Sequence, residues 1–317
     1  MNVKLLIITL LTGLTTLFPK SFVSSKSSEA KVIKPLNDNN LPYFELEPVP
    51  NVATQEHLAK AGLLFDAKQR KITWEKDMFT AYPIASLTKM MVALITVEDI
   101  KANKLSWETP IKVTKEASRI GGSKVYLKYG EIFTIRELMK SAMIASGNDA
   151  CYLLAQFNGG TESQFVERMN QRAKLLGMKT ARFSNCTGLP MANLQDNMAS
   201  PYDMLLLANE LLKHKEVVDI ARLEEESIQH GRRKFSYRNH NKLVIEYKDE
   251  VDGLKTGYTV RAGFCIVATS NRAGHRLISV VLGAHKSVTR NMLVAEMFNN
   301  YYSVVGLGRM GVQLTSN

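Results

Sequence analysis

The chain has 317 residues, of which 45% are hydrophobic and 22% charged, and its formal net charge is +11. This composition excludes extensive disorder and is sufficient for one large domain or two small ones. The three cysteines, Cys151, Cys186 and Cys265, do not form a disulfide framework or a metal-ligand spacing. The basic charge indicates either a contact with anionic polymers or a solvated basic surface. No nucleic-acid motif accompanies it, so we expect no nucleic-acid partner.

The N-terminus has the pattern of an export signal. Lys4 precedes an apolar run over residues 5–18, and a Ser-rich polar stretch follows at 20–28. The apolar run is short for a membrane span. We therefore expect residues 1–30 to be a signal peptide of an exported protein, with Ser28-Glu29-Ala30 as one cleavage site and an uncleaved anchor as the alternative. Membrane association is expected only through this segment.

The next segments predict the first half of a domain. Residues 31–55 carry several prolines and asparagines, which predicts an extended lead-in and no packed element. The β-rich segments Ala61–Asp66 and Lys71–Glu75 flank a polar turn and predict a β-hairpin. Apolar residues fill most of the surface of a predicted helix at 86–98, so we expect this helix to be buried in the middle of the domain. A second helical stretch covers residues 136–151.

The second half predicts two more helices and then strands. Thr161 begins a capping-box pattern for a helix that ends at Gly177, and Ser200 begins another helix. Three β-rich segments and a final helix follow, at 251–260, 263–269, 276–283 and 289–302. This order predicts an α/β (α+β) fold whose antiparallel sheet is assembled from both ends of the chain. We expect one catalytic domain at 56–305 and a tail at 306–317.

The first chemical motif is Ser86-Leu87-Thr88-Lys89. On a helix, residues i and i+3 share a face, so Ser86 and Lys89 point the same way. A serine becomes a nucleophile when a base removes its proton. A lysine is such a base only when burial or a nearby cation keeps it neutral. The pair alone is weak evidence, because most such pairs lie on solvated helix faces.

Two further motifs lie downstream. In Ser146-Gly147-Asn148 the serine can relay a proton, and the asparagine can bind an amide or hold a lysine. In Lys255-Thr256-Gly257 the glycine would let a substrate backbone pair as an added strand. Lys255 and Thr256 offer a cation and a hydroxyl to a carboxylate, and Lys255 would also lower the pKa of Lys89. The three motifs in this order form the signature of penicillin-interacting serine enzymes.

The chain resembles the low-molecular-mass penicillin-binding proteins that act as serine D-alanyl-D-alanine carboxypeptidases. The likeness extends from about Ala61 to Arg290. It includes Pro83–Met91, Leu127–Glu131, Ala145–Ala150, Asn185–Pro190, Asp252–Thr259 and 262–283. The resemblance implies the β-lactamase/DD-peptidase-like fold, in which helices flank an antiparallel sheet and an all-helical region holds Ser146 and Asn148.

The resemblance also implies catalytic roles. Ser86 would be acylated, with Lys89 as its base, while Ser146 and Asn148 would complete the proton path and the substrate contacts. The peptide bond between two D-alanines of a peptidoglycan stem peptide would be cleaved in two steps, through an acyl-enzyme. Penicillins and other β-lactams would acylate the same serine, and no metal or cofactor is expected.

The substrate-binding residues follow from the same resemblance. Lys255 and Thr256, next to Gly257, would bind the terminal carboxylate. The backbone N–H groups of Ser86 and Tyr258 would form the oxyanion hole. Arg290 lies where the family often has an arginine near the carboxylate site.

The chain departs from the family in three places. The family often has Asn-Arg-Asn before the last motif, where this chain has Asn239-His240-Asn241. The loop at 121–126 matches only in part. Many relatives continue beyond the C-terminal helix into a β-rich domain and an amphipathic membrane helix, and no such segment follows here. We therefore expect no membrane attachment by that route.

Three alternatives remain from the sequence. A peptidoglycan DD-endopeptidase would use the same site. A β-lactamase of the related class would need a Glu-x-x-Leu-Asn motif, which we do not find in the chain. A non-catalytic cell-wall or penicillin-binding protein would have no need of Lys89 beside Ser86. The histidines have no triad role, and His240 and His285 are the two nearest to the motifs.

Overall fold

The computed structural model describes residues 44–192, 194–230 and 232–311. The predicted signal peptide, most of the predicted lead-in and the end of the tail lie outside these residues. Within the described part of the chain, no helix combines the length and the apolar character needed to cross a membrane.

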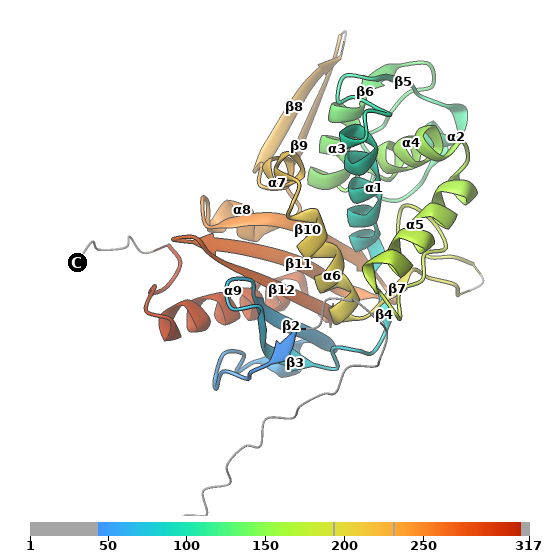
Figure 1. Ribbon diagram of the computed structural model, residues 1–317. Helices are drawn as coiled ribbons and strands as arrows, with labels where there is room; N and C mark the ends of the chain where they lie inside the picture. The colour runs from blue at the N-terminus through green and yellow to red at the C-terminus, as the bar shows by residue number, and fades with distance from the viewer. Residues whose placement is uncertain (1–43, 193, 231, 312–317) are drawn as a thin grey trace, which may run out of the picture. The chain divides into compact units, whose positions relative to one another are not determined.

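A six-stranded sheet is the centre of the fold, and its strands come from both ends of the chain (Figure 1). In spatial order they are β1 (Glu45–Leu46), β3 (Lys71–Lys76), β2 (Ala61–Asp66), β12 (His275–Ala284), β11 (Gly263–Arg272) and β10 (Val251–Thr259). Each neighbouring pair is antiparallel except β1 with β3. The predicted hairpin, the three late strands and their assembly into one sheet are confirmed.

Helices cover both faces of this sheet. On one face α9 (Ser287–Val304) buries Leu293, Met297 and Tyr302 in a cluster with residues of β11 and β12. On the other face α6 (Pro201–Leu211) and α1 (Lys89–Lys101) share a larger cluster with the sheet. The mixed fold with a helix-flanked sheet is therefore as predicted.

A mostly helical region lies beside the sheet (Figure 1). Its helices are α2 (Lys115–Arg119), α3 (Ile135–Ile144), α4 (Asn148–Gly159) and α5 (Glu162–Leu176). The remaining elements are short: β4 (Tyr82–Pro83) with β7 (Met198–Ala199), β5 (Pro110–Lys112) with β6 (Ile132–Thr134), β8 (Glu225–His230) with β9 (Arg233–Arg238), α7 (Lys215–Ala221) and α8 (Lys242–Glu246).

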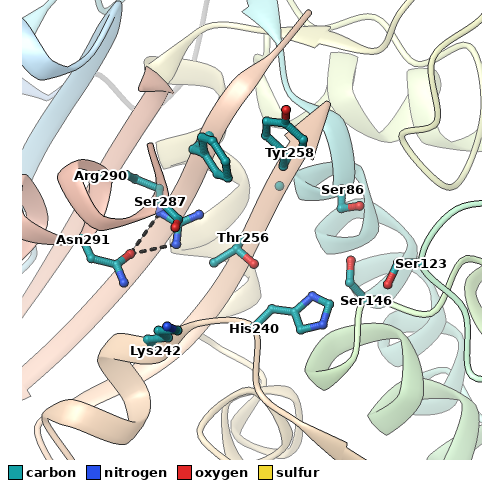
Figure 2. A pocket seen from close by; sticks show the side chains of 12 residues that line it. Ser86, Ser123, Ser146, His240, Lys242, Thr256, Tyr258, Ser287, Arg290 and Asn291 are labelled. Atoms are coloured by element: carbon teal, nitrogen blue, oxygen red, sulfur yellow. Dashed lines mark hydrogen bonds between the residues drawn. The ribbon is translucent and has the colours of Figure 1, made fainter. Parts of the chain in front are cut away.

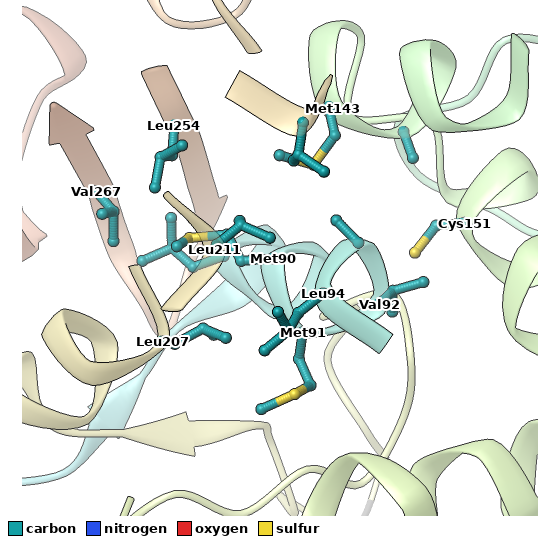
Figure 3. Packing of buried hydrophobic residues seen from close by; sticks show 14 of the residues in the cluster. Met90, Met91, Val92, Leu94, Met143, Cys151, Leu207, Leu211, Leu254 and Val267 are labelled. Carbon is teal, nitrogen blue, oxygen red and sulfur yellow. The ribbon is translucent and has the colours of Figure 1, made fainter. Parts of the chain in front are cut away.

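Helix α1 is buried in the middle of the domain, as its sequence predicts. Met90, Met91 and Leu94 are fully buried, and Figure 3 shows them among residues of α6 and β10. The helix begins one turn later than predicted, because Ala85–Thr88 forms a 3₁₀ helix that leads into Lys89. Apolar side chains on nearly all sides of α1 pack against its neighbours, so the helix is held in place. Lys89, its first residue, is held with it.

The predicted helix boundaries at Thr161 and Ser200 are both capped by side chains, but of these two only Ser200 has the reciprocal capping box. The Thr161 hydroxyl accepts from the backbone N–H of Gln164, and α5 ends at Gly177 in the left-handed conformation. Ser200 and Asp203 form a reciprocal capping box at the start of α6.

Two expectations differ from the structure. The lead-in is packed from residue 44 onwards: Phe44 and Val52 are buried, and β1 pairs with β3. A strand of two residues has no alternating pattern of apolar side chains to detect. The prolines of this segment were therefore its clearest signal, and they indicate an extended chain. The tail is also partly packed, because the buried Met310 donates its backbone N–H to Asn299. The β8–β9 hairpin was not predicted, since its strands are mostly polar.

Candidate active site

Ser86 and Lys89 lie together at the start of α1. Nζ of Lys89 is 3.0 Å from Oγ of Ser86. It also donates to Oδ1 of Asn148 and to the backbone oxygen of Thr187, both at 2.7 Å. The lysine side chain is 1% exposed, whereas Ser86 remains partly accessible. The amine is therefore held against the hydroxyl by two further contacts from distant parts of the chain.

The surroundings of Lys89 disfavour the protonated form of its amine. Burial lowers the pKa of Lys89, although the nearby Cys151, Cys186 and Asp149 act in the opposite direction. Burial also lowers the pKa of Lys255 well below its usual range, and the positive charge of Lys89 lowers it further. The repulsion between the two amines is mutual, so protonation of one disfavours protonation of the other. A neutral Lys89 has the lone pair that a base requires.

Asn148 links Lys89 to the helical region. It is the first residue of α4, and its Nδ2 donates to the backbone oxygen of Gly121 at 2.9 Å. The next residue, Asp149, accepts from the backbone N–H groups of Val125 and Leu127. The loop at 121–127 is thus tied to the start of α4. Ser146 lies just before it at φ +57°, and this conformation places its side chain in the pocket.

Two glycines let the backbone approach Ser86 closely. A Cβ on Gly257 would lie 2.9 Å from the oxygen of Ile84 and 3.1 Å from the nitrogen of Ser86. A Cβ on Gly188 would lie 2.0 Å from the oxygen of Ala85. The space beside the Cα of Gly257 is thus taken by the segment that carries Ser86. The pairing of a substrate backbone along this edge strand stays a prediction.

Figure 2 shows the pocket in front of Ser86, with a volume of about 400 Å³. It is lined by Ser86, Ser123, Ser146, His240, Lys242, Thr256, Gly257, Tyr258, Phe264, Ser287, Arg290 and Asn291. Six predicted site residues are therefore brought together at this surface: Ser86, Ser146, Thr256, Gly257, Tyr258 and Arg290. The other three, Lys89, Asn148 and Lys255, are buried and do not line it.

Arg290 provides a cation at the end of the pocket away from Ser86 (Figure 2). Its guanidinium donates through Nε and Nη2 to Oδ1 of Asn291 and through Nη1 to the backbone oxygen of Cys265. Burial lowers the pKa of Arg290 to about 10, so the group remains charged at neutral pH. A fixed cation on this wall suits a carboxylate ligand.

Several site residues were missed from the sequence. The carbonyl of Thr187 holds Lys89, and Ser123, Lys242, Ser287 and Asn291 line the pocket. Thr187 lies in the segment Asn185–Pro190 that resembles the family, but no side-chain chemistry in this segment indicates a role for its carbonyl. A backbone oxygen carries no residue-type signal, so only the folded geometry identifies it.

Within the described residues, one group has the composition of a metal site. Oxygens of Glu98 and Glu210 and a ring nitrogen of His214 lie within 4.8 Å of one another. Arg172 already donates to Glu98 through Nε and Nη2, and Lys213 donates to Glu210. These cations compensate both carboxylates, so the cluster is an ion-pair network between helices.

The three cysteines are buried and unpaired. Contact with Cys151 and burial raise the pKa of Cys186, and burial raises the pKa of Cys265 to about 11. Cys151 and Cys265 belong to the larger hydrophobic cluster, which indicates packing roles. Cys186 lies in a loop but is fully buried, which also disfavours reactivity.

The fold and the arrangement of Ser86, Lys89 and Asn148 define the class of DD-peptidase-like serine proteins. The chain belongs to the S11 peptidase family, described as D-alanyl-D-alanine carboxypeptidase, whose model matches residues 49–286.

Curated relatives support this assignment. D-alanyl-D-alanine carboxypeptidase DacF of Bacillus subtilis is 35% identical over 248 residues, which cover 78% of this chain and 63% of the relative. DacC of Escherichia coli is 32% identical over 237 residues, 71% of this chain and 56% of the relative. The chain therefore spans less than two thirds of the length of these relatives.

Solved structures share the fold. The D-alanyl-D-alanine carboxypeptidase DacD of Francisella tularensis has a TM-score of 0.71 and 29% identity, covering 81% of this chain and 71% of that one. Penicillin-binding protein D2 of Listeria monocytogenes, solved with ampicillin bound, has a TM-score of 0.68 and 27% identity. It covers 76% of this chain and 96% of that one.

Proposed function

We propose that the chain is a serine D-Ala-D-Ala carboxypeptidase that removes the terminal D-alanine from peptidoglycan stem pentapeptides. The observation that carries the proposal is the buried amine of Lys89, 3.0 Å from Ser86 Oγ and held by Asn148. The family assignment and the names of the relatives support it. β-Lactams are the expected covalent inhibitors, since the Listeria relative was solved with ampicillin bound.

The reaction follows from this geometry. Lys89 accepts the proton of Ser86 as Oγ attacks the carbonyl carbon between the two D-alanines. The oxyanion that forms accepts hydrogen bonds from the backbone N–H groups of Ser86 and Tyr258. The C–N bond then breaks, and the leaving amine takes a proton through Ser146 or Lys89. Water next attacks the ester on Ser86, which releases the shortened peptide and restores the hydroxyl.

Thr256 and Arg290 give the site its preference for a free C-terminus. Both line the pocket beyond Ser86, and Lys255 lies buried behind Thr256 on β10. A carboxylate placed there meets the hydroxyl of Thr256 and the cation of Arg290, whereas an amide or an extended chain gains less from that charge. This arrangement supports carboxypeptidase activity over cleavage inside a longer chain.

The test is the release of free D-alanine from a muramyl-type pentapeptide. The chain without residues 1–30 is compared with Ser86→Ala, and Ser118→Ala, outside the pocket, is the matched control. Release by the parent and the control, but not by Ser86→Ala, supports the proposal. No release from the parent would overturn it.

An endopeptidase is the second candidate function. A D-alanyl-D-alanine endopeptidase of Haemophilus influenzae is 30% identical over 227 residues, 71% of this chain and 74% of that relative. Cross-linked muropeptides distinguish the two functions, because an endopeptidase separates the cross-linked strands and a carboxypeptidase does not. A Ser86→Ala chain with full biological effect would instead indicate a non-catalytic wall-binding protein.

The location of the protein is part of the proposal. The pattern at residues 1–30 supports export to the periplasm or another extracytoplasmic space. There the proposed substrate is peptidoglycan, and the enzyme would influence cell shape by trimming it. Fusion of this segment to a reporter that works only after export, with Lys4→Glu and a shortened apolar run as variants, tests the signal.

A further inference from the structure

His240 is fixed in the wall of the pocket by its neighbours. Asn239 and Asn241 are buried, and each anchors the backbone through its side chain: Asn239 donates to two backbone oxygens at the end of α7, and Asn241 donates to that of Gly253. The N–H of His240 donates to the oxygen of Ile144 at 3.2 Å. The backbone is thus held on three sides, and only the imidazole is free to adjust.

The imidazole extends into the pocket from the wall opposite β10. Figure 2 shows it between Thr256 and Ser146, with Lys242 and Arg290 toward the far end. None of the twelve residues that line the pocket is acidic, and two of them, Lys242 and Arg290, are cations. The space between His240 and Thr256 is therefore suited to an anion that accepts hydrogen bonds from both sides.

Four basic side chains from different elements lie around this space. Lys242 of α8 and Arg290 of α9 line it, whereas Lys89 of α1 and Lys255 of β10 are buried and do not line it. Burial of the ring lowers the pKa of His240 to about 4, and any positive charge on Lys255 or Lys89 acts in the same direction. The ring is therefore neutral near neutral pH, with one nitrogen as donor and the other as acceptor.

We propose that His240 recognises the terminal carboxylate of the peptide and takes up a proton from solvent when that carboxylate binds. The proposal rests on the proposed function, because it assigns a role in the same site. A bound carboxylate places a negative charge beside the ring, so the charged imidazole becomes favourable. It can then donate a charge-assisted hydrogen bond to the anion, across from the hydroxyl of Thr256.

Proton uptake makes binding depend on pH. The pKa of His240 would rise on binding from about 4 toward the ordinary value of 6.5. Between these values the bound state holds more protons than the free state, so affinity for a carboxylate ligand increases as pH falls. The slope reaches about tenfold per pH unit for one proton. Turnover responds in the opposite direction, because acid protonates Lys89, so binding must be measured separately from catalysis.

The direct test is an NMR pH titration of the histidine ring carbons. The chain is labelled at its six histidines and measured free and after acylation by a penicillin, which carries its own carboxylate. The signal of His240 is the one absent from His240→Asn. We expect its pKa to rise by at least about one unit on acylation, from the linkage above. The exposed His285 is the control, and its titration should not change.

Three results of this NMR titration would overturn the proposal. An unchanged pKa of His240 in the acylated chain would show that the ring does not sense the carboxylate. An equal shift at His285 would show a general effect of acylation. Failure of penicillin to acylate Ser86 would also remove the basis of the proposal, since no carboxylate would be held in the pocket.

Peptide kinetics separate this proposal from the proposed function. If D-alanine is released, His240→Asn should raise KM about tenfold with little change in kcat, because a charged hydrogen bond to the substrate is lost. His240→Arg should restore a low KM that no longer depends on pH in this window. D-Alanine release with an unchanged KM in His240→Asn would overturn the role of His240 and leave the carboxypeptidase function intact.

Discussion

The side-chain oxygen of Asn148 accepts a 2.7 Å hydrogen bond from Nζ of Lys89, although 59 positions separate the two residues. The contact joins α4 of the helical region to α1 beside the sheet. The same amine lies 3.0 Å from Oγ of Ser86 and donates to the backbone oxygen of Thr187, which belongs to a third segment. The nucleophile and its base are thus positioned by three separate parts of the fold.

Replacement of the base tests this arrangement directly. Lys89→Met keeps an apolar stem of similar length but removes the proton acceptor. We expect acylation of Ser86 by a penicillin to slow by about 10²–10⁴-fold, the usual contribution of a general base. Lys101→Met, at the exposed end of the same helix, should keep the parental rate. An unchanged rate in Lys89→Met would exclude lysine as the base.

Loss of the anchor should have a smaller effect. Asn148→Ala removes the oxygen that holds Lys89 and the donor to Gly121. The buried groups left without a partner should cost about 1–3 kcal/mol of unfolding free energy. Acylation should slow by about tenfold or more as the amine loses its position. Denaturant titration and acylation kinetics measure the two effects, and a stable variant with parental kinetics would contradict the assignment.

The packing of Gly257 against the nucleophile segment gives a third prediction. In Gly257→Ala the new methyl group would contact the oxygen of Ile84 and the nitrogen of Ser86. We expect at least about 1–3 kcal/mol of destabilisation, typical of overpacking, and a loss of acylation as Ser86 is displaced. Gly121→Ala is the matched control, because nothing lies within 4 Å of its Cβ position. Equal behaviour of the two variants would show that the contact is unimportant.

The rate of acylation should fall toward acid pH. Burial lowers the pKa of Lys89, so its neutral form persists below the usual range of lysine. As pH falls through that lowered pKa, the amine gains a proton and can no longer act as a base. Penicillin acylation measured against pH should therefore show an acid limb, which reports the coupled pair Lys89 and Lys255. A rate that stays constant, or rises, toward acid pH would indicate a different base.

The buried cysteines predict resistance to thiol reagents. Cys151, Cys186 and Cys265 are each fully buried and unpaired. In the native chain we expect no rapid labelling by a maleimide, and in denaturant three thiols should react. Rapid labelling without loss of structure would show that at least one of them is accessible.

Much of the site could be predicted because its residues lie in short local motifs. Ser86 and Lys89 are one helical turn apart, and the apolar residues around them indicate a buried helix. The contacts that position them are tertiary, and the sequence does not reveal these. The carbonyl of Thr187 and the close packing of Gly188 against Ala85 depend on backbone positions that no residue type encodes.

Some elements of the fold could likewise be predicted from the sequence and others could not. Long apolar segments such as Met90–Val97 and the strands β10 to β12 could be predicted from their patterns. The two-residue strand β1 could not, because its pairing with β3 depends on a neighbour and leaves no periodicity of its own. Lys255 of β10 was predicted to meet the substrate, yet its side chain is buried and does not line the pocket. The sequence indicates the residue type, and only the packing shows how deeply the side chain lies.

The pairing of β2 with β12 has a consequence for how the chain acquires its structure. Ala61 pairs with Leu282, so the early hairpin cannot join the sheet until nearly the whole domain has been synthesised. Such distant pairings slow folding, because a long loop must close before the contacts form. A growing chain that has not yet produced β12 leaves β2 and β11 with open edges. Until that strand arrives, both edges are exposed to mispairing with other chains.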